Sequence, residues 1–85
     1  MRTVVSENEV SAKIETAASE FPRIQEQFEA LEWTLAHNPN IGIPLRDGYY
    51  VYRQGQVLAK SPELTVLYSF TADEVHVLSV RILTE

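Results

Sequence analysis

The 85-residue sequence contains no cysteine, and its longest apolar runs are far too short to cross a bilayer. The missing cysteine excludes a disulfide framework and a thiolate metal site. The N-terminus also lacks the apolar stretch of a signal peptide, so we expect a cytoplasmic protein without a membrane role. A chain of this length forms one domain, residues 1–85, and its hydrophobic content of 45% is that of a globular protein.

Positive charge is scarce as well. Seven lysines and arginines stand against twelve carboxylates, which gives a net charge of −5 at pH 7. Residues 1–45 carry −4 of this charge and residues 46–85 carry −1, so the acidity belongs to the first half. Because lysine and arginine supply most of the affinity for phosphate backbones, the composition disfavours a general nucleic-acid role.

The most regular pattern lies in the last third of the chain. Apolar and polar side chains alternate over residues 64–70, and a second alternating run follows the polar turn at residues 71–74. The aspartate of this turn, Asp73, can make a local hydrogen bond from its side chain to the backbone. A period of two predicts two half-buried strands joined as a hairpin. In the second strand we assign Leu78, Val80 and Ile82 to one face, and the opposite face receives Val75, Val77, Ser79 and Arg81. An isolated hairpin is marginal in water, so upstream helices must cover one side of it.

Two amphipathic helices are predicted upstream, after a short β-prone segment at residues 2–6. Ser6 and Glu9 have the spacing of a capping box for the first helix. Its apolar face would consist of Val10, Ile14, Ala17, Ala18 and Phe21. The second helix, about residues 22–37, has an apolar stripe of helical period made of Ile24, Phe28, Leu31 and Leu35. Trp33 lies off that stripe, and we expect it to pack in the core, with an exposed anchor for a partner as the alternative.

A loop rich in proline, glycine and asparagine follows the helices, and residues 49–54 then form a tyrosine-rich strand. Residues 57–60 could pair back on this strand. The predicted fold is α+β, a helical hairpin packed on one face of a small antiparallel sheet, in the order β-α-α-β-β-β.

The uncovered side of the sheet is then the candidate functional surface. It would present Thr65, Leu67, Ser69, Val77, Ser79 and Arg81, joined by Tyr50 and Tyr52 if Val51 points inward. Aromatic side chains on such a face can stack on bases, although tyrosine in a strand more commonly serves the sheet itself. We interpret Tyr68 as structural and His37 as a helix-capping residue. The sequence has no Ser/His/Asp set, phosphate loop or metal spacing, so no cofactor and no metal is expected.

Several segments carry a family resemblance. The strings EALEWTLAHNPNIGIPLRDGYYVYRQ and SPELTVLYSFTADEVHVLSVRI resemble the RelE/ParE superfamily of toxins from type II toxin–antitoxin modules. The hairpin TVLYSFTADEVHVLSV is similar to the family pattern Arg-Val-x-Tyr-x-x-x-Asp-x-x-Val-x-Val-Leu. The resemblance runs from about Val10 to Ile82. It implies two helices on an antiparallel sheet, a cognate antitoxin as partner, and toxicity through ribosomal messenger-RNA cleavage or through DNA gyrase.

The family's ribonuclease residues are poorly matched. Tyr50 and Tyr52 stand where the resemblance places lysines, and Thr65 stands where it places an arginine. The sequence ends at Glu85, before the family's C-terminal arginine and tyrosine, and Arg81 matches only loosely. Basic groups on that face would stabilise the charge that develops on the phosphate, so their loss argues against the known chemistry.

We therefore expect a toxin-like component of a plasmid-stabilisation module that acts by protein binding. Binding residues would be Tyr50, Tyr52, Thr65, Arg46 and Trp33. One alternative is a ribosome-dependent ribonuclease with a rearranged site that uses Arg81, Arg53, Lys60 and the tyrosines. The other is a decayed, non-toxic family member that still binds an antitoxin or forms a homodimer.

Overall fold

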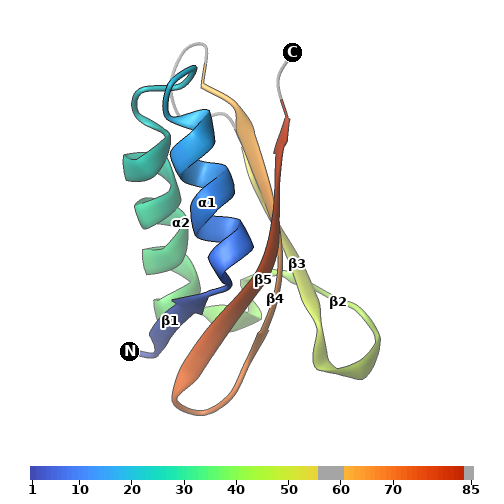
Figure 1. Ribbon diagram of the computed structural model, residues 1–85. Coiled ribbons are helices and arrows are strands. Elements are labelled where there is room, and N and C mark those ends of the chain that lie inside the picture. The colour runs from blue at the N-terminus through green and yellow to red at the C-terminus, as the bar shows by residue number, and fades with distance from the viewer. Residues whose placement is uncertain (56–60, 84–85) are drawn as a thin grey trace.

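A computed structural model of the protein describes residues 1–55 and 61–83 (Figure 1). Its elements are β1 (Thr3–Ser6), α1 (Asn8–Ala17), α2 (Ile24–His37), β2 (Ile43–Pro44), β3 (Tyr50–Gln54), β4 (Glu63–Phe70) and β5 (Glu74–Leu83). Two short 3-10 turns, η1 (Pro39–Ile41) and η2 (Arg46–Gly48), flank β2. The predicted α+β class is confirmed, and both helices lie on the same face of the sheet (Figure 1). The strand predicted at residues 57–60 lies outside the described residues.

The five strands of the described chain form one sheet in the order β1-β5-β4-β3-β2. β1 runs parallel to the first half of β5, with Thr3 opposite Glu74 and Ser6 opposite Val77, and the other neighbours are antiparallel. The sheet is therefore mixed, whereas the sequence predicted an antiparallel one. Two helices and three strands separate β1 from β5 along the chain, and so long a connection permits the parallel pairing that a hairpin cannot make.

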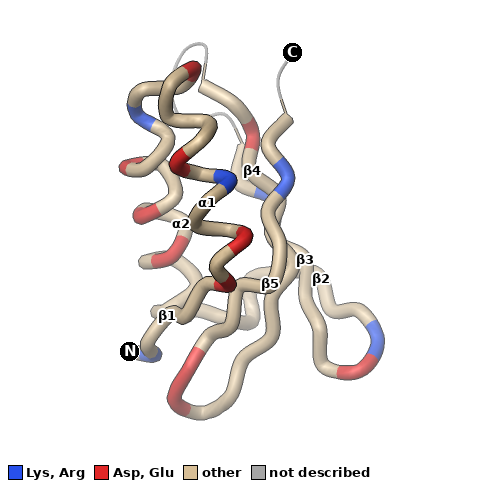
Figure 2. The backbone as a smooth tube through the Cα atoms, in the orientation of Figure 1, with Lys and Arg blue, Asp and Glu red and all other residues tan. Residues whose placement is uncertain are grey.

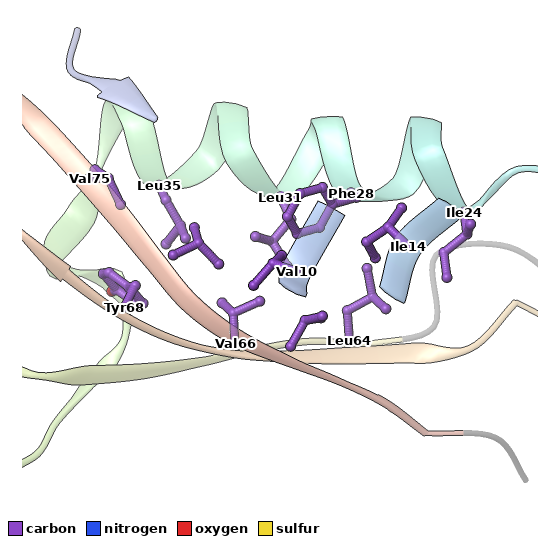
Figure 3. Packing of buried hydrophobic residues seen from close by; sticks show 12 residues of the cluster. Val10, Ile14, Ile24, Phe28, Leu31, Leu35, Leu64, Val66, Tyr68 and Val75 are labelled. Carbon is purple, nitrogen blue, oxygen red and sulfur yellow. The ribbon is translucent and has the colours of Figure 1, made fainter. Parts of the chain in front are cut away.

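One hydrophobic core joins the helices to the sheet (Figure 3). The predicted stripe of α2 is fully confirmed, since all four of its members are buried. They pack with two residues of α1 against the inward side chains of β4 and β5. The labelled residues of Figure 3 point from both layers into this space, namely Val10, Ile14, Ile24, Phe28, Leu31, Leu35, Leu64, Val66, Tyr68 and Val75.

The predicted local contacts at the start of α1 and in the last turn of the sheet differ from those observed. α1 has Glu7 at its N-cap with no side-chain hydrogen bond, so the predicted capping box does not form. The Ser6 hydroxyl instead donates to Glu32 Oε2 of α2 at 3.4 Å. In the β4–β5 turn the Thr71 hydroxyl, and not an aspartate, accepts hydrogen bonds from the amides of Asp73 and Glu74.

An irregularity in the pairing of β4 with β5 changes which side chains face the core. Leu67 lies opposite Ser79 and Tyr68 opposite Val77, so Leu78 is an extra residue without a partner in β4. Such a bulge reverses the alternation of the strand that contains it. Val77 is consequently buried, as is Val80. The prediction that Val77 lies on the uncovered face is wrong for this reason.

Tyr68 fastens the loop after α2 to the sheet. Its hydroxyl donates to the carbonyl oxygen of Pro39 at 2.6 Å and accepts from the amide of Gly42 at 3.0 Å. Burial raises the pKa of this phenol, which keeps the donating proton in place. A side chain at Gly42 would also lie against the carbonyl oxygen of Val51, so the close approach requires glycine here. The structural interpretation of Tyr68 is confirmed.

Neither helix in the described part of the chain has the length and apolar character needed to span a membrane.

Candidate binding face

The face of the sheet opposite the helices carries two adjacent rows of side chains, fixed by the strand register. In the first row, Arg53 of β3 lies opposite Thr65 of β4, which in turn lies opposite Arg81 of β5. In the second row, Ile43, Val51, Leu67 and Ser79 follow one another across β2, β3, β4 and β5. The uncovered face therefore consists of a short basic row beside a mainly apolar one.

The two arginines of the basic row differ in whether they form an ion pair. Arg53 makes a two-point contact with Glu63 of β4, at 3.1 Å from Nε and 2.7 Å from Nη2 to the same carboxylate oxygen. Arg81 is exposed and has no ion pair with any residue that the structure describes. The sequence placed Arg53, Thr65 and Arg81 among the site candidates, and the register brings these three together. Lys60 lies outside the described residues.

The apolar row continues into the β2–β3 hairpin. An open pocket of about 610 Å³ is lined by Pro44, Leu45, Arg46, Asp47, Tyr49 and Leu67. Its lining joins the hairpin turn to the centre of the uncovered face. Of the hairpin residues that line this pocket, only Arg46 was predicted as a binding residue, because a loop rich in proline and glycine shows no periodicity from which a surface can be inferred.

Tyr50 and Tyr52 lie on the other side of the sheet. Their partners in β4 are Tyr68 and Val66, which are core residues, so both tyrosines share the helix-covered face. The ring of Tyr50 stacks on that of Tyr68 with centroids 5.6 Å apart. The premise that Val51 points inward is wrong, and the two tyrosines are removed from the candidate binding face.

Trp33 and Arg46 are both exposed, but neither joins the basic row. Trp33 projects from α2 with 63% of its surface exposed, and its ring lies 4.0 Å from that of His37. The prediction that it packs in the core is wrong, and the alternative of an exposed residue holds. The His37 ring is hydrogen-bonded at 2.8 Å to the Trp33 carbonyl oxygen, in keeping with a helix-end role. Arg46 lies in the turn of the β2–β3 hairpin.

The second half of β5 is an open sheet edge. β1 covers β5 only from Glu74 to Val77, and beyond it no described strand adjoins that side. Lys13 of α1 donates from Nζ to the carbonyl oxygen of Val80 at 3.0 Å. A groove of about 650 Å³ runs beside this edge, and residues of α1, Phe21 and Ile82 line it. This edge could not be located from the sequence, because its position depends on where β1 ends its pairing with β5.

The helices form an acidic outer surface, with most of the carboxylates of the first half of the chain (Figure 2). Glu15, Glu29 and Glu32 line a groove between α1 and α2. Burial raises the pKa of the Glu32 carboxyl, the hydrogen bond from Ser6 lowers it, and the neighbouring Glu29 raises it further. This surface repels phosphates and favours basic partners.

The polar groups on and beside the uncovered face are few among the described residues. Within residues 1–55 and 61–83 no group of three or more His, Cys, Asp or Glu side chains could hold a metal ion. His76 lies opposite Ser69, and the bulge at Leu78 separates it along β5 from Arg81 of the basic row. Its Nε2 lies 3.2 Å from Oε1 of Glu74. Arg53 and Arg81 can attract an anion, but the described face offers no acid–base pair beside them.

Comparison of the chain with protein-family models, with curated proteins and with solved structures gave no match.

Proposed function

We propose that this protein is a RelE/ParE-like toxin component of a type II toxin–antitoxin module, and that it acts through protein contacts. The observation that carries the proposal is the uncovered sheet face, with an apolar row beside a basic row that contains only two arginines. A surface of this composition suits a protein partner, because apolar contacts flanked by a few charges are typical of protein interfaces.

The order and layering of the elements support the resemblance, although the parallel β1–β5 pairing departs from the antiparallel sheet that it implies. A first strand, two helices and then the remaining strands occur in the expected order, and the helices lie on one face of the sheet. The β4–β5 hairpin, which carries the most specific part of the resemblance, forms the centre of that sheet together with β3. The support for the family rests on this order and on the motif, since fold alone does not imply function.

An antitoxin segment would bind along the open edge of β5. An extended peptide can hydrogen-bond to such an edge while its side chains enter the adjacent groove. Lys13 and Arg81 lie on either side of this edge, so an acidic segment with alternating apolar side chains is complementary to it. The ammonium group of Lys13 already holds the Val80 carbonyl oxygen, and a carboxylate of the partner can pair with it.

The ribonuclease alternative draws support from the alignment of Arg53, Thr65 and Arg81 in one row. Two features weaken it. The guanidinium of Arg53 is bound to Glu63, and the tyrosines that would assist the arginines belong to the opposite face. A rearranged site that uses both sets would need them on the same side of the sheet.

The test is inducible expression in bacteria, with and without the product of the adjacent gene. We expect growth arrest that the partner relieves, intact messenger RNA, and loss of toxicity when the apolar row is changed by Leu67→Glu. Arg81→Ala should leave arrest unchanged, and Arg23→Ala is a matched control because Arg23 pairs with Glu26 on the helix surface. An assay of gyrase supercoiling then distinguishes gyrase from other protein targets.

Three results would count against the proposal. Cleaved transcripts that disappear with Arg81→Ala would establish the ribonuclease alternative. Normal growth together with binding of the adjacent gene product would indicate a non-toxic family member. Normal growth without any such binding would remove the toxin–antitoxin assignment altogether.

A further inference from the structure

The β2–β3 hairpin carries a concentration of exposed apolar side chains. Among the described residues, eight large apolar side chains are exposed, and four of them fall within residues 41–49. These four are Ile41, Ile43, Leu45 and Tyr49, with 44%, 69%, 52% and 41% of their surfaces exposed. The other four are scattered along the chain. Three of the four belong to the β2–β3 hairpin, and Ile41 lies in η1 just before it. Apolar exposure gathered in one segment is typical of an interaction site, whereas single exposed side chains need no explanation.

The patch is continuous with the apolar row of the uncovered face. Ile43 lies opposite Val51, and Val51 lies opposite Leu67, so all three face the same side. The 610 Å³ pocket at the hairpin reaches Leu67 from Leu45 and Tyr49. The exposed side chain of Ile43 lies beside this apolar pocket, so Ile43 of one molecule could insert into the pocket of another.

Sheet extension is a poor explanation for this edge. β2 is only two residues long, and Pro44 has no amide hydrogen to donate. Proline on a short edge strand blocks strand addition. The contact must therefore be made by side chains.

The charges of the hairpin turn indicate which partner fits this surface. The hairpin turn places Arg46 next to Asp47, one cation and one anion at adjacent positions (Figure 2). A two-fold axis that passes beside the turn would bring Arg46 of each copy to Asp47 of the other, so this turn can be complementary to itself. The helix surface is acidic, and two copies that met through it would bring carboxylates together. We propose that the β2–β3 hairpin and the apolar row form the interface of a homodimer with two-fold symmetry. The inference stands without the toxin proposal, but a second copy and a protein target would compete for the apolar row, so the dimer has to dissociate before a target binds there.

The test is sedimentation equilibrium of the full chain, purified without a partner, from about 1 to 300 μM. We expect a monomer–dimer equilibrium in which Leu45→Glu raises the dissociation constant by at least about 30-fold. Trp33→Glu is the matched control, because it changes another exposed apolar residue by the same charge on the far helix surface. It should change the constant by less than about 3-fold.

Two further variants test the charges. Arg46→Glu places like charges at both reciprocal contacts and should weaken the dimer by about 10-fold. Asp47→Asn removes the anion but keeps a residue that tolerates the positive φ of 61° at this position, so the turn is preserved. It should weaken the dimer by a smaller factor. Circular dichroism of each variant confirms that its fold is intact.

A chain that remains monomeric over the whole concentration range overturns the proposal. The same holds for a dimer that Trp33→Glu dissociates while Leu45→Glu leaves it intact. A dimer that responds to Leu45→Glu but strengthens with Arg46→Glu would refute the reciprocal ion pairs and with them the two-fold arrangement.

Discussion

Replacing Tyr68 by phenylalanine removes one oxygen atom from the core and tests how the loop after α2 is held. The hydroxyl makes two hydrogen bonds, to the carbonyl oxygen of the buried Pro39 and from the amide of Gly42. The rings of Tyr50 and Phe70 that pack around the Tyr68 ring are unaffected by the change. Any loss of stability therefore comes from the hydrogen bonds and not from packing.

The magnitude follows from the two partners. A hydrogen bond contributes about 0.5–1.5 kcal/mol net, and a buried group left without a partner costs about 1–3 kcal/mol. The Pro39 oxygen is enclosed, whereas the Gly42 amide is only partly buried and can recruit water. We expect Tyr68→Phe to lower the free energy of unfolding by about 2 kcal/mol, which shifts the urea midpoint by roughly 1–2 M.

Urea unfolding measures the loss, and hydrogen exchange localises it. The amide of Gly42 should lose protection beyond the global change, because its acceptor is gone. Tyr50→Phe is the control, since the described residues offer its hydroxyl no hydrogen bond, and it should change stability by less than about 0.5 kcal/mol. Equal losses in the two variants, or a Gly42 amide that stays protected in Tyr68→Phe, would refute the reasoning.

Two further predictions concern the same layers of the fold. Gly42→Ala should cost about 1–3 kcal/mol in thermal unfolding, because a Cβ there would lie 2.8 Å from the Val51 carbonyl oxygen. Gly55→Ala should be neutral or stabilising, because no atom of the described residues lies within 4 Å of a Cβ there. The folded protein raises the pKa of Glu32 and therefore holds its carboxyl proton more tightly than the unfolded chain does. The free energy of unfolding should consequently fall as the pH rises above the usual carboxyl pKa of about 4.3. Glu32→Gln should therefore be more stable than the parent at about pH 7.5 and similar to it at about pH 4, and equal urea midpoints at both values would contradict this.

Much of the fold could be predicted from local patterns. The stripe of α2 is a clean helical period, and the side chains that it names are the ones that reach the core. The alternation in β4 likewise places Leu64, Val66 and Tyr68 inward, as observed. In both cases the burial of one face follows from the geometry of a single element, which a sequence displays directly.

Apart from the capping box of α1, the main errors concern how one element packs or pairs with another. The facing of Tyr50 and Tyr52 depends on the register of β3 against β4, and a shift of one residue exchanges the two faces. Val77 changes face because Leu78 is accommodated as an extra residue, which alternation within β5 alone cannot reveal. The basic row was predicted in part, because Thr65 and Arg81 occupy regular outward positions in their strands. The exposed apolar residues of the β2–β3 hairpin were missed, because their segment shows no helical or strand periodicity.

The parallel pairing of β1 with β5 has a consequence for the order in which the protein can assemble during translation. Thr3–Ser6 and both helices leave the ribosome first, yet the strand that β1 joins is complete only after Val77 has been synthesised. Until then β1 has no partner in the sheet. The core therefore closes only after segments about 70 residues apart have paired, and long-range pairing of this kind is slow to form.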